Sequence, residues 1–311
     1  MTNRAVTAET LYTNIDNKKI KQMATQNITY ATVPTQFITA ANGIKFAYRK
    51  MGEKNDAPII LFNHLTSNLD NADPRIMDAL AARHEIISFD YRGVGASSGE
   101  EAKSIQDMAK DSLAFIKALG YDKVDIFSFS MGGFIIQEIM EMEPTLVRKL
   151  ILAGTGPRGG KGISDVVKLT YWDIFKGYLT FRDPKFYLFF TSTKKGKKAA
   201  RQFLKRLKER TVNRDTPVKI KTLQTQLKAI SKWGYEQAAD LSKFTLPVLV
   251  MSGDNDRMVP TPNSYDLAKR FPNAELVIYE DAGHGGIFQN HEDFVKKALA
   301  FYAKENYSPK K

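Results

Sequence analysis

The stretch that decides the fold runs from residue 124 to residue 139 and reads VDIFSFSMGGFIIQEI. Its beginning, Val124–Phe127, is an apolar run typical of a buried strand, and its end has the spacing of a helix. Ser130 lies at the turn between them. A sharp strand–turn–helix junction brings two backbones together, so small residues such as Ser128 and Gly132 are required beside the serine. The stretch therefore predicts an exposed nucleophilic Ser130; the alternative is a serine that merely caps a helix.

Other apolar runs of strand length alternate with helical segments on both sides of this stretch. They are residues 59–62, 86–89, 150–153, 248–251 and 276–279. Before them, the turn Asn42-Gly43 between two short strand-like segments predicts a hairpin. This alternation predicts an α/β fold with a mostly parallel central sheet and helices on both faces. In such sheets functional sites form at the C-terminal ends of the strands.

Two further segments match known motifs in sequence but lack a flanking strand or helix that those motifs require. Gly95–Gly99 fits G-x-S-x-G around Ser97, but neither a strand nor a helix adjoins it directly, which favours a loop. Gly154–Gly159 fits the dinucleotide pattern G-x-G-x-x-G, but Pro157 prevents a helix from starting at once. We therefore expect Ser97 to be structural, and we expect no nucleotide cofactor.

A serine nucleophile needs a base and an acid that orients the base. Of the four histidines, His284 is the best candidate, because it follows the strand ending at Tyr279 and lies in the flexible sequence Ala-Gly-His-Gly-Gly. Asp254 and Asp256 both follow the strand at 248–251, and either could orient the imidazole. The chain order is Ser, Asp, His, each after its own strand.

The 311-residue chain has no cysteine, which excludes disulfides, thiolate metal sites and a cysteine nucleophile. Its charge is uneven. Residues 157–243 carry 21 basic and 7 acidic side chains, a net charge of +14, whereas the rest of the chain has a net charge of −2. We call residues 157–243 the insert, because Gly- and Pro-rich sequence borders a clear shift in composition.

The insert has a basic stretch and many aromatic residues. The basic side chains that we expect on a solvated face are Arg201, Lys205, Arg206, Lys208 and Arg210. Attraction of an anionic substrate or surface is the alternative for these residues. Most of the aromatic side chains are expected to pack the insert onto the body, and some could line a pocket.

With these residues in view, the sequence resembles the α/β-hydrolase superfamily, most closely its haloperoxidase, esterase and enol-lactonase branch. The resemblance rests on residues 62–65, 89–97, 130–133, 253–260 and 282–286, and it is weak in the insert. It implies Asp256 as the acid, backbone N–H groups of Leu65 and Met131 as the oxyanion hole, and a structural role for His64. It also implies that the insert is a helical cap, with helices near 167–179, 199–210 and 218–233.

The predicted organisation has three parts: a polar N-terminal extension (1–35), a hydrolase core (36–156 and 244–311) and the cap (157–243). The resemblance implies a serine hydrolase of the carboxylesterase or lactonase type, acting through Ser130, His284 and Asp256 on a small-molecule ester or lactone. A cofactor-free haloperoxidase or perhydrolase with the same triad, and a slow-turnover small-molecule receptor, are the alternatives. We expect no metal, no cofactor, no nucleic-acid partner and no membrane span; a homo-oligomer is left open, and the expected compartment is the cytoplasm.

Overall fold

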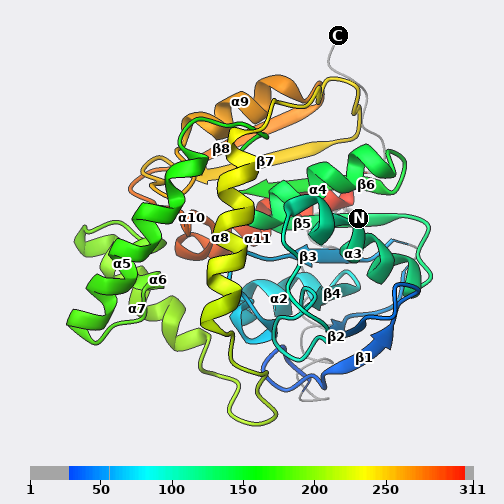
Figure 1. The fold of residues 1–311 in the computed structure, drawn as a ribbon, viewed down its shortest axis with the longest axis horizontal. Helices are drawn as coiled ribbons and strands as arrows, with labels where there is room; N and C mark the ends of the chain where they lie inside the picture. The colour runs from blue at the N-terminus through cyan, green and yellow to red at the C-terminus, as the bar shows by residue number, and fades with distance from the viewer. Residues whose placement is uncertain (1–27, 56, 305–311) are drawn as a thin grey trace, which may run out of the picture.

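The computed structural model of the protein describes residues 28–55 and 57–304 (Figure 1). Most of the predicted N-terminal extension lies outside these residues. Its last part, residues 28–35, joins the body, because Tyr30 and Val33 are buried in the hydrophobic core. The Tyr30 hydroxyl lies 2.7 Å from the carbonyl of Leu69, to which it donates, and 2.8 Å from the hydroxyl of Ser88.

An eight-stranded sheet forms the centre of the molecule, in the order β1-β2-β4-β3-β5-β6-β7-β8. The strands are β1 (Gln36–Thr39), β2 (Lys45–Met51), β3 (Ile59–Phe62), β4 (Ile86–Phe89), β5 (Val124–Phe129), β6 (Val147–Ala153), β7 (Val248–Gly253) and β8 (Ala274–Tyr279). The first two form the predicted hairpin, and β2 also runs antiparallel to β4. All other pairs are parallel, as predicted.

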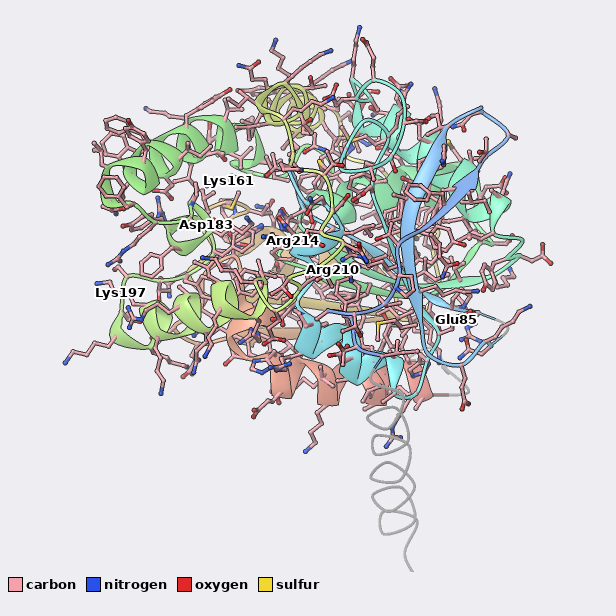
Figure 2. All side chains as sticks on the ribbon, turned by 90° about the horizontal axis from the view of Figure 1, so that it is seen from below. Glu85, Lys161, Asp183, Lys197, Arg210 and Arg214 are labelled. Carbon is pink, nitrogen blue, oxygen red and sulfur yellow. The ribbon has the colours of Figure 1, made fainter. Side chains whose placement is uncertain are left out.

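Helices cover both faces of the sheet, which confirms the predicted fold class. The body helices are α2 (Pro74–Ala81), α3 (Ile105–Ala118), α4 (Met131–Met142), α9 (Pro262–Arg270), α10 (Gly286–Gln289) and α11 (His291–Ala303), with the short 3-10 helix η1 (Leu69–Asn71). Figure 2 shows α2 and α11 together below the sheet, whereas α3 and α4 pack against each other on the opposite face. Strands β3, β4 and β5 are consequently buried along their whole length, which explains their continuous apolar sequences.

The strand order reverses between β3 and β5, and this reversal positions the candidate site. The chain passes from β3 to β4 on one side of the sheet and then returns to place β5 on the other side of β3. The two connecting segments leave the C-terminal ends of these strands in opposite directions, so a crevice can form there. Ser130 follows β5, and His64 and Leu65 follow β3.

The insert leaves the body after β6 and returns to it before β7. It contains η2 (Ile163–Asp165), α5 (Val166–Thr180), α6 (Lys185–Leu188), α7 (Lys194–Arg206) and α8 (Ile220–Tyr235). In Figure 1, α5, α6 and α7 lie to one side of the sheet, and α8 runs across the molecule between them and the body helices. Three of these helices correspond to the predicted ones, although α7 starts and ends earlier than expected.

The prediction of a solvated basic face is wrong for two of its five residues, Arg206 at the end of α7 and Arg210 just beyond it. Arg206 is buried and donates three hydrogen bonds to the carboxylate of Asp73: Nε to Oδ1 at 2.9 Å and to Oδ2 at 3.1 Å, and Nη2 to Oδ2 at 2.6 Å. Arg210 is buried and donates to the carbonyls of Tyr30 and Val33. These arginines attach the insert to the body, because a guanidinium can bind a carboxylate or several carbonyls at once.

Candidate active site

Ser130 occupies a strained turn between β5 and α4. Its backbone torsions are φ 56° and ψ −121°. A residue other than glycine adopts this strained conformation only where the surrounding structure enforces it. Its N–H extends the ladder to β6 by donating to the carbonyl of Ala153. The predicted exposure of Ser130 is wrong: the residue is only 3% exposed, because it lies at the junction of β5 and α4 inside the body. Its side chain forms no capping hydrogen bond with α4. This geometry differs from that of an ordinary serine N-cap, whose side chain accepts from the helix.

The residues beside Ser130 show why the turn needs small side chains. A Cβ atom on Gly132 would lie 2.1 Å from the carbonyl oxygen of Phe62 in β3, so no larger residue fits there without movement. Ser128, which stands where glycine is usual in this motif, is fully buried, and its hydroxyl donates to the carbonyl of Ile151 at 2.7 Å. The hydroxyl is therefore satisfied, and Ser128 is accommodated in β5.

His284 and Asp256 form a buried pair. The Nδ1 atom of His284 lies 2.7 Å from Oδ2 of Asp256, and both side chains are inaccessible to solvent. A carboxylate only accepts hydrogen bonds, so Nδ1 carries a proton, and Nε2 is the nitrogen that can act as the base. Among the described residues, this Nε2 atom is buried without a hydrogen-bond partner. The imidazole is thus oriented to accept a proton at Nε2.

The structure distinguishes between the two candidate acids. Asp256 is buried, and its second oxygen accepts hydrogen bonds from the backbone N–H groups of Met258 and Val259 at 2.9 and 3.0 Å. Asp254 is exposed, and it accepts from the backbone N–H of Ala282 at 3.1 Å, which supports the loop that carries His284. Asp256 therefore contacts the imidazole of His284, whereas Asp254 binds the backbone of the loop that carries His284.

The predicted oxyanion donors belong to two different segments. Met131 is the first residue of α4, where backbone N–H groups have no acceptor within the helix. Leu65 is buried in the loop after β3, and its carbonyl accepts from Nδ1 of His64 at 2.7 Å. The next residue, Thr66, has φ 55° and donates its N–H to Oε1 of Gln226 in α8 at 2.6 Å. The loop after β3 is thus held by His64 within the body and by Gln226 of the insert.

His64 is a neutral structural residue in this loop. Burial, followed by the charge of Lys185, lowers the pKa of His64 to about 3. Its ring lies edge-on to Phe129 and Phe189, at centroid distances of 5.7 and 5.1 Å. It contacts the candidate site without pairing with a carboxylate.

The remaining polar candidates lie away from this arrangement. Ser97 donates to the carbonyl of Asp90 and accepts from the N–H of Ala47, both at 2.9 Å, and so it tethers a loop as expected. His84 precedes β4 at its N-terminal end and contacts Tyr302. His291 opens α11. No nucleotide-binding helix starts within Gly154–Gly159, because that segment has no regular structure.

A cavity of about 120 Å³ lies next to the oxyanion loop. Its walls include His64 and Leu65 from the body and Thr170, Ile174 and Phe189 from the insert. Neither Ser130 nor His284 is among its lining residues, so the cavity adjoins the expected oxyanion donor Leu65 and not the serine itself.

Phe189 and Gln226 are two insert residues near the site that the sequence did not single out. The Phe189 ring lines the cavity and lies 5.4 Å from the ring of His284, and its carbonyl accepts from the N–H of Gly285 at 2.7 Å. Phe189 belonged to an aromatic run without a distinguishing pattern, and Gln226 to an ordinary helix. Only the tertiary position of the insert identifies them.

The parts of the chain that the structure describes contain no group of three or more His, Cys, Asp or Glu side chains suited to hold a metal ion. Within these same ranges, no helix combines the length and apolarity needed to cross a bilayer.

Comparison with known proteins identifies the family. The model of the α/β hydrolase fold family matches residues 57–291, so the chain belongs to this family. A solved structure, the α/β hydrolase fold protein from Chitinophaga pinensis, is 36% identical, with a TM-score of 0.83 over 89% of this chain and 100% of the other. The recognised family and its esterase- and haloperoxidase-like branch are thereby confirmed.

Two more distant relatives carry names that describe a reaction. The pimeloyl-[acyl-carrier protein] methyl ester esterase of Aliivibrio salmonicida is 24% identical over 74% of this chain and 87% of its own length. The enol-lactonase from Burkholderia xenovorans is 20% identical, with a TM-score of 0.70 over 86% of this chain and 100% of the other, and its likeness concerns the fold. The chain is therefore an α/β hydrolase with esterases among its relatives.

Proposed function

We propose that the protein is a serine hydrolase that cleaves small carboxylic esters or lactones. The observation that carries this proposal is the combination of a strained, uncapped Ser130 with the buried His284–Asp256 hydrogen bond. The position of these residues after β5, β7 and β8 supports it, because all three lie at the same edge of the sheet. Relatives named as esterases support the same class of reaction.

In the first step, the Ser130 hydroxyl attacks the ester carbonyl while Nε2 of His284 takes its proton. Asp256 stabilises the resulting imidazolium through the Nδ1–H hydrogen bond. The N–H groups of Leu65 and Met131 stabilise the negative oxygen of the tetrahedral intermediate, and each donor is worth roughly 10²-fold in rate. His284 then donates its proton to the leaving alcohol, and an acyl-enzyme forms.

Water completes the reaction. His284 removes a proton from the water molecule, the hydroxide attacks the acyl carbonyl, and Ser130 leaves with its proton restored. We propose that the insert acts as a cap that encloses this chemistry, with residues 157–243 as its bounds. The contacts of Phe189 with His284 and of Gln226 with Thr66 support this role, because both place the insert directly against the candidate site.

The cavity beside Leu65 supports a preference for small acyl groups, because an acyl group whose oxygen is bound by the Leu65 N–H would lie next to it. Its volume of about 120 Å³ is below the roughly 300–1,000 Å³ of pockets that hold drug-sized ligands. Leu65, Ile174 and Phe189 would contact an alkyl group, whereas the charged residues Asp183 and Lys185 line another part of the same cavity. We therefore expect acetyl and butyryl esters to react faster than octanoyl esters.

Hydrolysis of p-nitrophenyl acetate, butyrate and octanoate tests the proposal. Ser130→Ala should lower kcat by on the order of 10⁴-fold or more, and Asp256→Asn by about 10⁴-fold, because the imidazole loses its orientation. Asp254→Asn is the matched control, since this neighbouring carboxyl does not contact the imidazole; it should change kcat less than about tenfold. Undiminished hydrolysis by Ser130→Ala would contradict the proposed nucleophile.

A further inference from the structure

Helix α5 in the insert has its apolar residues on the outside. Its buried positions are Val166, Thr170, Asp173 and Gly177, three or four residues apart, and most of them are polar or small. The opposite face is apolar and exposed: Tyr171, Trp172, Phe175, Tyr178 and Leu179 are each at least 44% exposed. Phe181, directly after the helix, is 97% exposed. A surface helix normally has the reverse arrangement, with its apolar stripe towards the core.

These exposed side chains form one continuous surface, which we call the α5 stripe (Tyr171, Trp172, Phe175, Tyr178, Leu179 and Phe181). Residues three or four apart share one side of a helix, so Tyr171, Phe175 and Tyr178 are neighbours. From residue 171 to residue 181 the stripe extends roughly 15 Å along the helix. Figure 1 shows α5 at the outer edge of the molecule, away from the sheet, so no other element of the described chain covers this side.

Basic side chains border the stripe on both sides. On one side, a groove of about 640 Å³ between α5 and α8 is lined by Tyr171, Lys228 and Lys232. On the other side, a cleft of about 860 Å³ is lined by Trp172 together with Lys176, Arg182, Lys197 and Arg257. Figure 2 shows Lys197 at the same outer side of the insert.

Acidic side chains contribute little to this surface. The two carboxylates that line the cleft, Asp173 and Asp256, are buried. Asp173 pairs with Arg257 at 3.3 Å, and Asp256 pairs with His284. No acidic residue is among those that line the groove between α5 and α8. Asp183, two residues after Phe181, is exposed, and its carboxylate lies 3.5 Å from Nζ of Lys185. Basic side chains still outnumber the exposed acidic ones around the α5 stripe, in keeping with the net charge of +14 on the insert.

We propose that the α5 stripe docks the protein onto an anionic lipid surface. Aromatic side chains, tryptophan and tyrosine above all, favour the boundary between headgroups and acyl chains, and neighbouring lysines and arginines attract anionic headgroups. Near such a surface each basic residue contributes about a fivefold increase in binding. The helix would lie flat, with its aromatic residues in the boundary and the cations of the groove and cleft on either side.

Charge argues against a second copy of the chain as the occupant. In a symmetric dimer the same patch of both subunits meets, so the basic borders of one subunit would face the basic borders of the other. The exposed cations Lys168, Lys176 and Arg182 would then be opposed by like charges. An anionic surface satisfies the same cations.

The chain contains its own reporter for this contact. It has two tryptophans, of which Trp172 is 62% exposed in the α5 stripe and Trp233 is fully buried. Vesicles of phosphatidylcholine with phosphatidylglycerol, and of phosphatidylcholine alone, are titrated into the full chain while tryptophan emission is recorded. Sedimentation of the same vesicles measures the bound fraction.

The test variant is Phe175→Ser/Tyr178→Ser/Phe181→Asn, which keeps Trp172. Asparagine is used at 181 because it tolerates the left-handed backbone of that position, φ 53°. The control is Phe37→Ser/Tyr265→Ser, which removes two exposed aromatic residues outside the insert. We expect a blue shift and sedimentation of wild type and control with the anionic vesicles, at least tenfold weaker binding by the test variant, and weaker binding at high salt.

Equal binding of wild type and test variant to anionic vesicles would overturn the proposal, as would equal binding of wild type to both kinds of vesicle. Absence of vesicle binding, with a dimeric wild type and a monomeric test variant in size-exclusion chromatography, would show that the α5 stripe is a self-association surface instead. None of these measurements depends on hydrolysis, so the docking proposal and the proposed reaction stand or fall separately.

Discussion

The inner and outer faces of the insert differ in which side chains they bury: the inner face buries cations, and the outer face exposes aromatic residues. On the inner face, the cations Arg206 and Arg210 are buried and bind the body. On the outer face, aromatic residues such as Trp172 and Phe181 are exposed. An ordinary globular surface has cations outside and aromatic residues inside. The difference indicates that the inner face is shaped by contacts with the body, whereas the outer face fits the proposed contact with an anionic lipid surface.

Helices α5 and α8 show the same contrast within one layer. Helix α8 buries Leu227, Ile230 and Trp233 and exposes Lys228 and Lys232, as an amphipathic helix should. Helix α5 contacts α8, but its buried residues include the polar Thr170 and Asp173. The inner side of α5 is polar where it meets the small cavity, to which Thr170 contributes a buried hydroxyl without a partner among the described residues.

The largest expected change in the free energy of unfolding comes from a substitution on the inner face. Arg206→Ala should lower the free energy of unfolding by about 3–5 kcal/mol, because it leaves the fully buried carboxylate of Asp73 without its charge partner. Urea denaturation measures the change. Arg201→Ala, which removes an exposed cation from the same helix, is the matched control and should stay within about 0.5 kcal/mol of wild type. Equal effects of the two substitutions would mean that Arg206 does not attach the insert.

A smaller effect is expected from protonation of His64, whose ring touches Phe189 on the inner face. Burial lowers its pKa to about 3 from the ordinary 6.5, so the unfolded chain takes up a proton first as the pH falls. The stability that neutral His64 contributes is complete above pH 6.5 and is lost between pH 6.5 and 3. At pH 5 the loss is about 2 kcal/mol relative to pH 7.

His64→Gln isolates this contribution, because glutamine does not titrate. The variant should lose about 2 kcal/mol less than wild type between pH 7 and pH 5, as measured by urea denaturation at both values. A wild type and a variant with the same pH dependence would show that His64 is not held neutral by the fold.

The smallest effect should come from the outer face. Phe175→Ser is expected to change the free energy of unfolding by less than about 0.5 kcal/mol, since this ring is already exposed. Phe203→Ser in α7 is the control on the inner face; this ring is fully buried, and its loss should cost about 3–5 kcal/mol. If Phe175→Ser destabilised the protein as strongly, the outer face would be part of the core.

The sheet and the arrangement around Ser130 could be predicted because local sequence determines them. A buried parallel strand needs a continuous apolar run, and the turn at Ser130 needs Gly132 within reach of Phe62. The resemblance to the family also selected Asp256 over Asp254, in agreement with the hydrogen bond to His284. These patterns depend on few residues and on backbone sterics.

The orientation of the insert could not be predicted, because it depends on distant partners. Arg206 is buried only because Asp73, 133 positions away in sequence, lies opposite it. Gln226 reaches Thr66 across 160 positions. A count of basic residues gives the net charge of the insert but not the direction in which each side chain points. For the same reason, the contact between Phe189 and His284 could not be predicted, because Phe189 is one of several aromatic residues in a continuous run.

The central claim is that Ser130 is the activated nucleophile, and covalent labelling tests it most directly. A fluorophosphonate probe reacts with a serine that a nearby base activates: the base takes the hydroxyl proton as the oxygen attacks phosphorus, and fluoride leaves. Intact mass and peptide mapping should show one adduct, on Ser130, with no adduct in Ser130→Ala and undiminished labelling in Ser97→Ala. An unlabelled wild type, or an adduct on Ser97, would contradict the account.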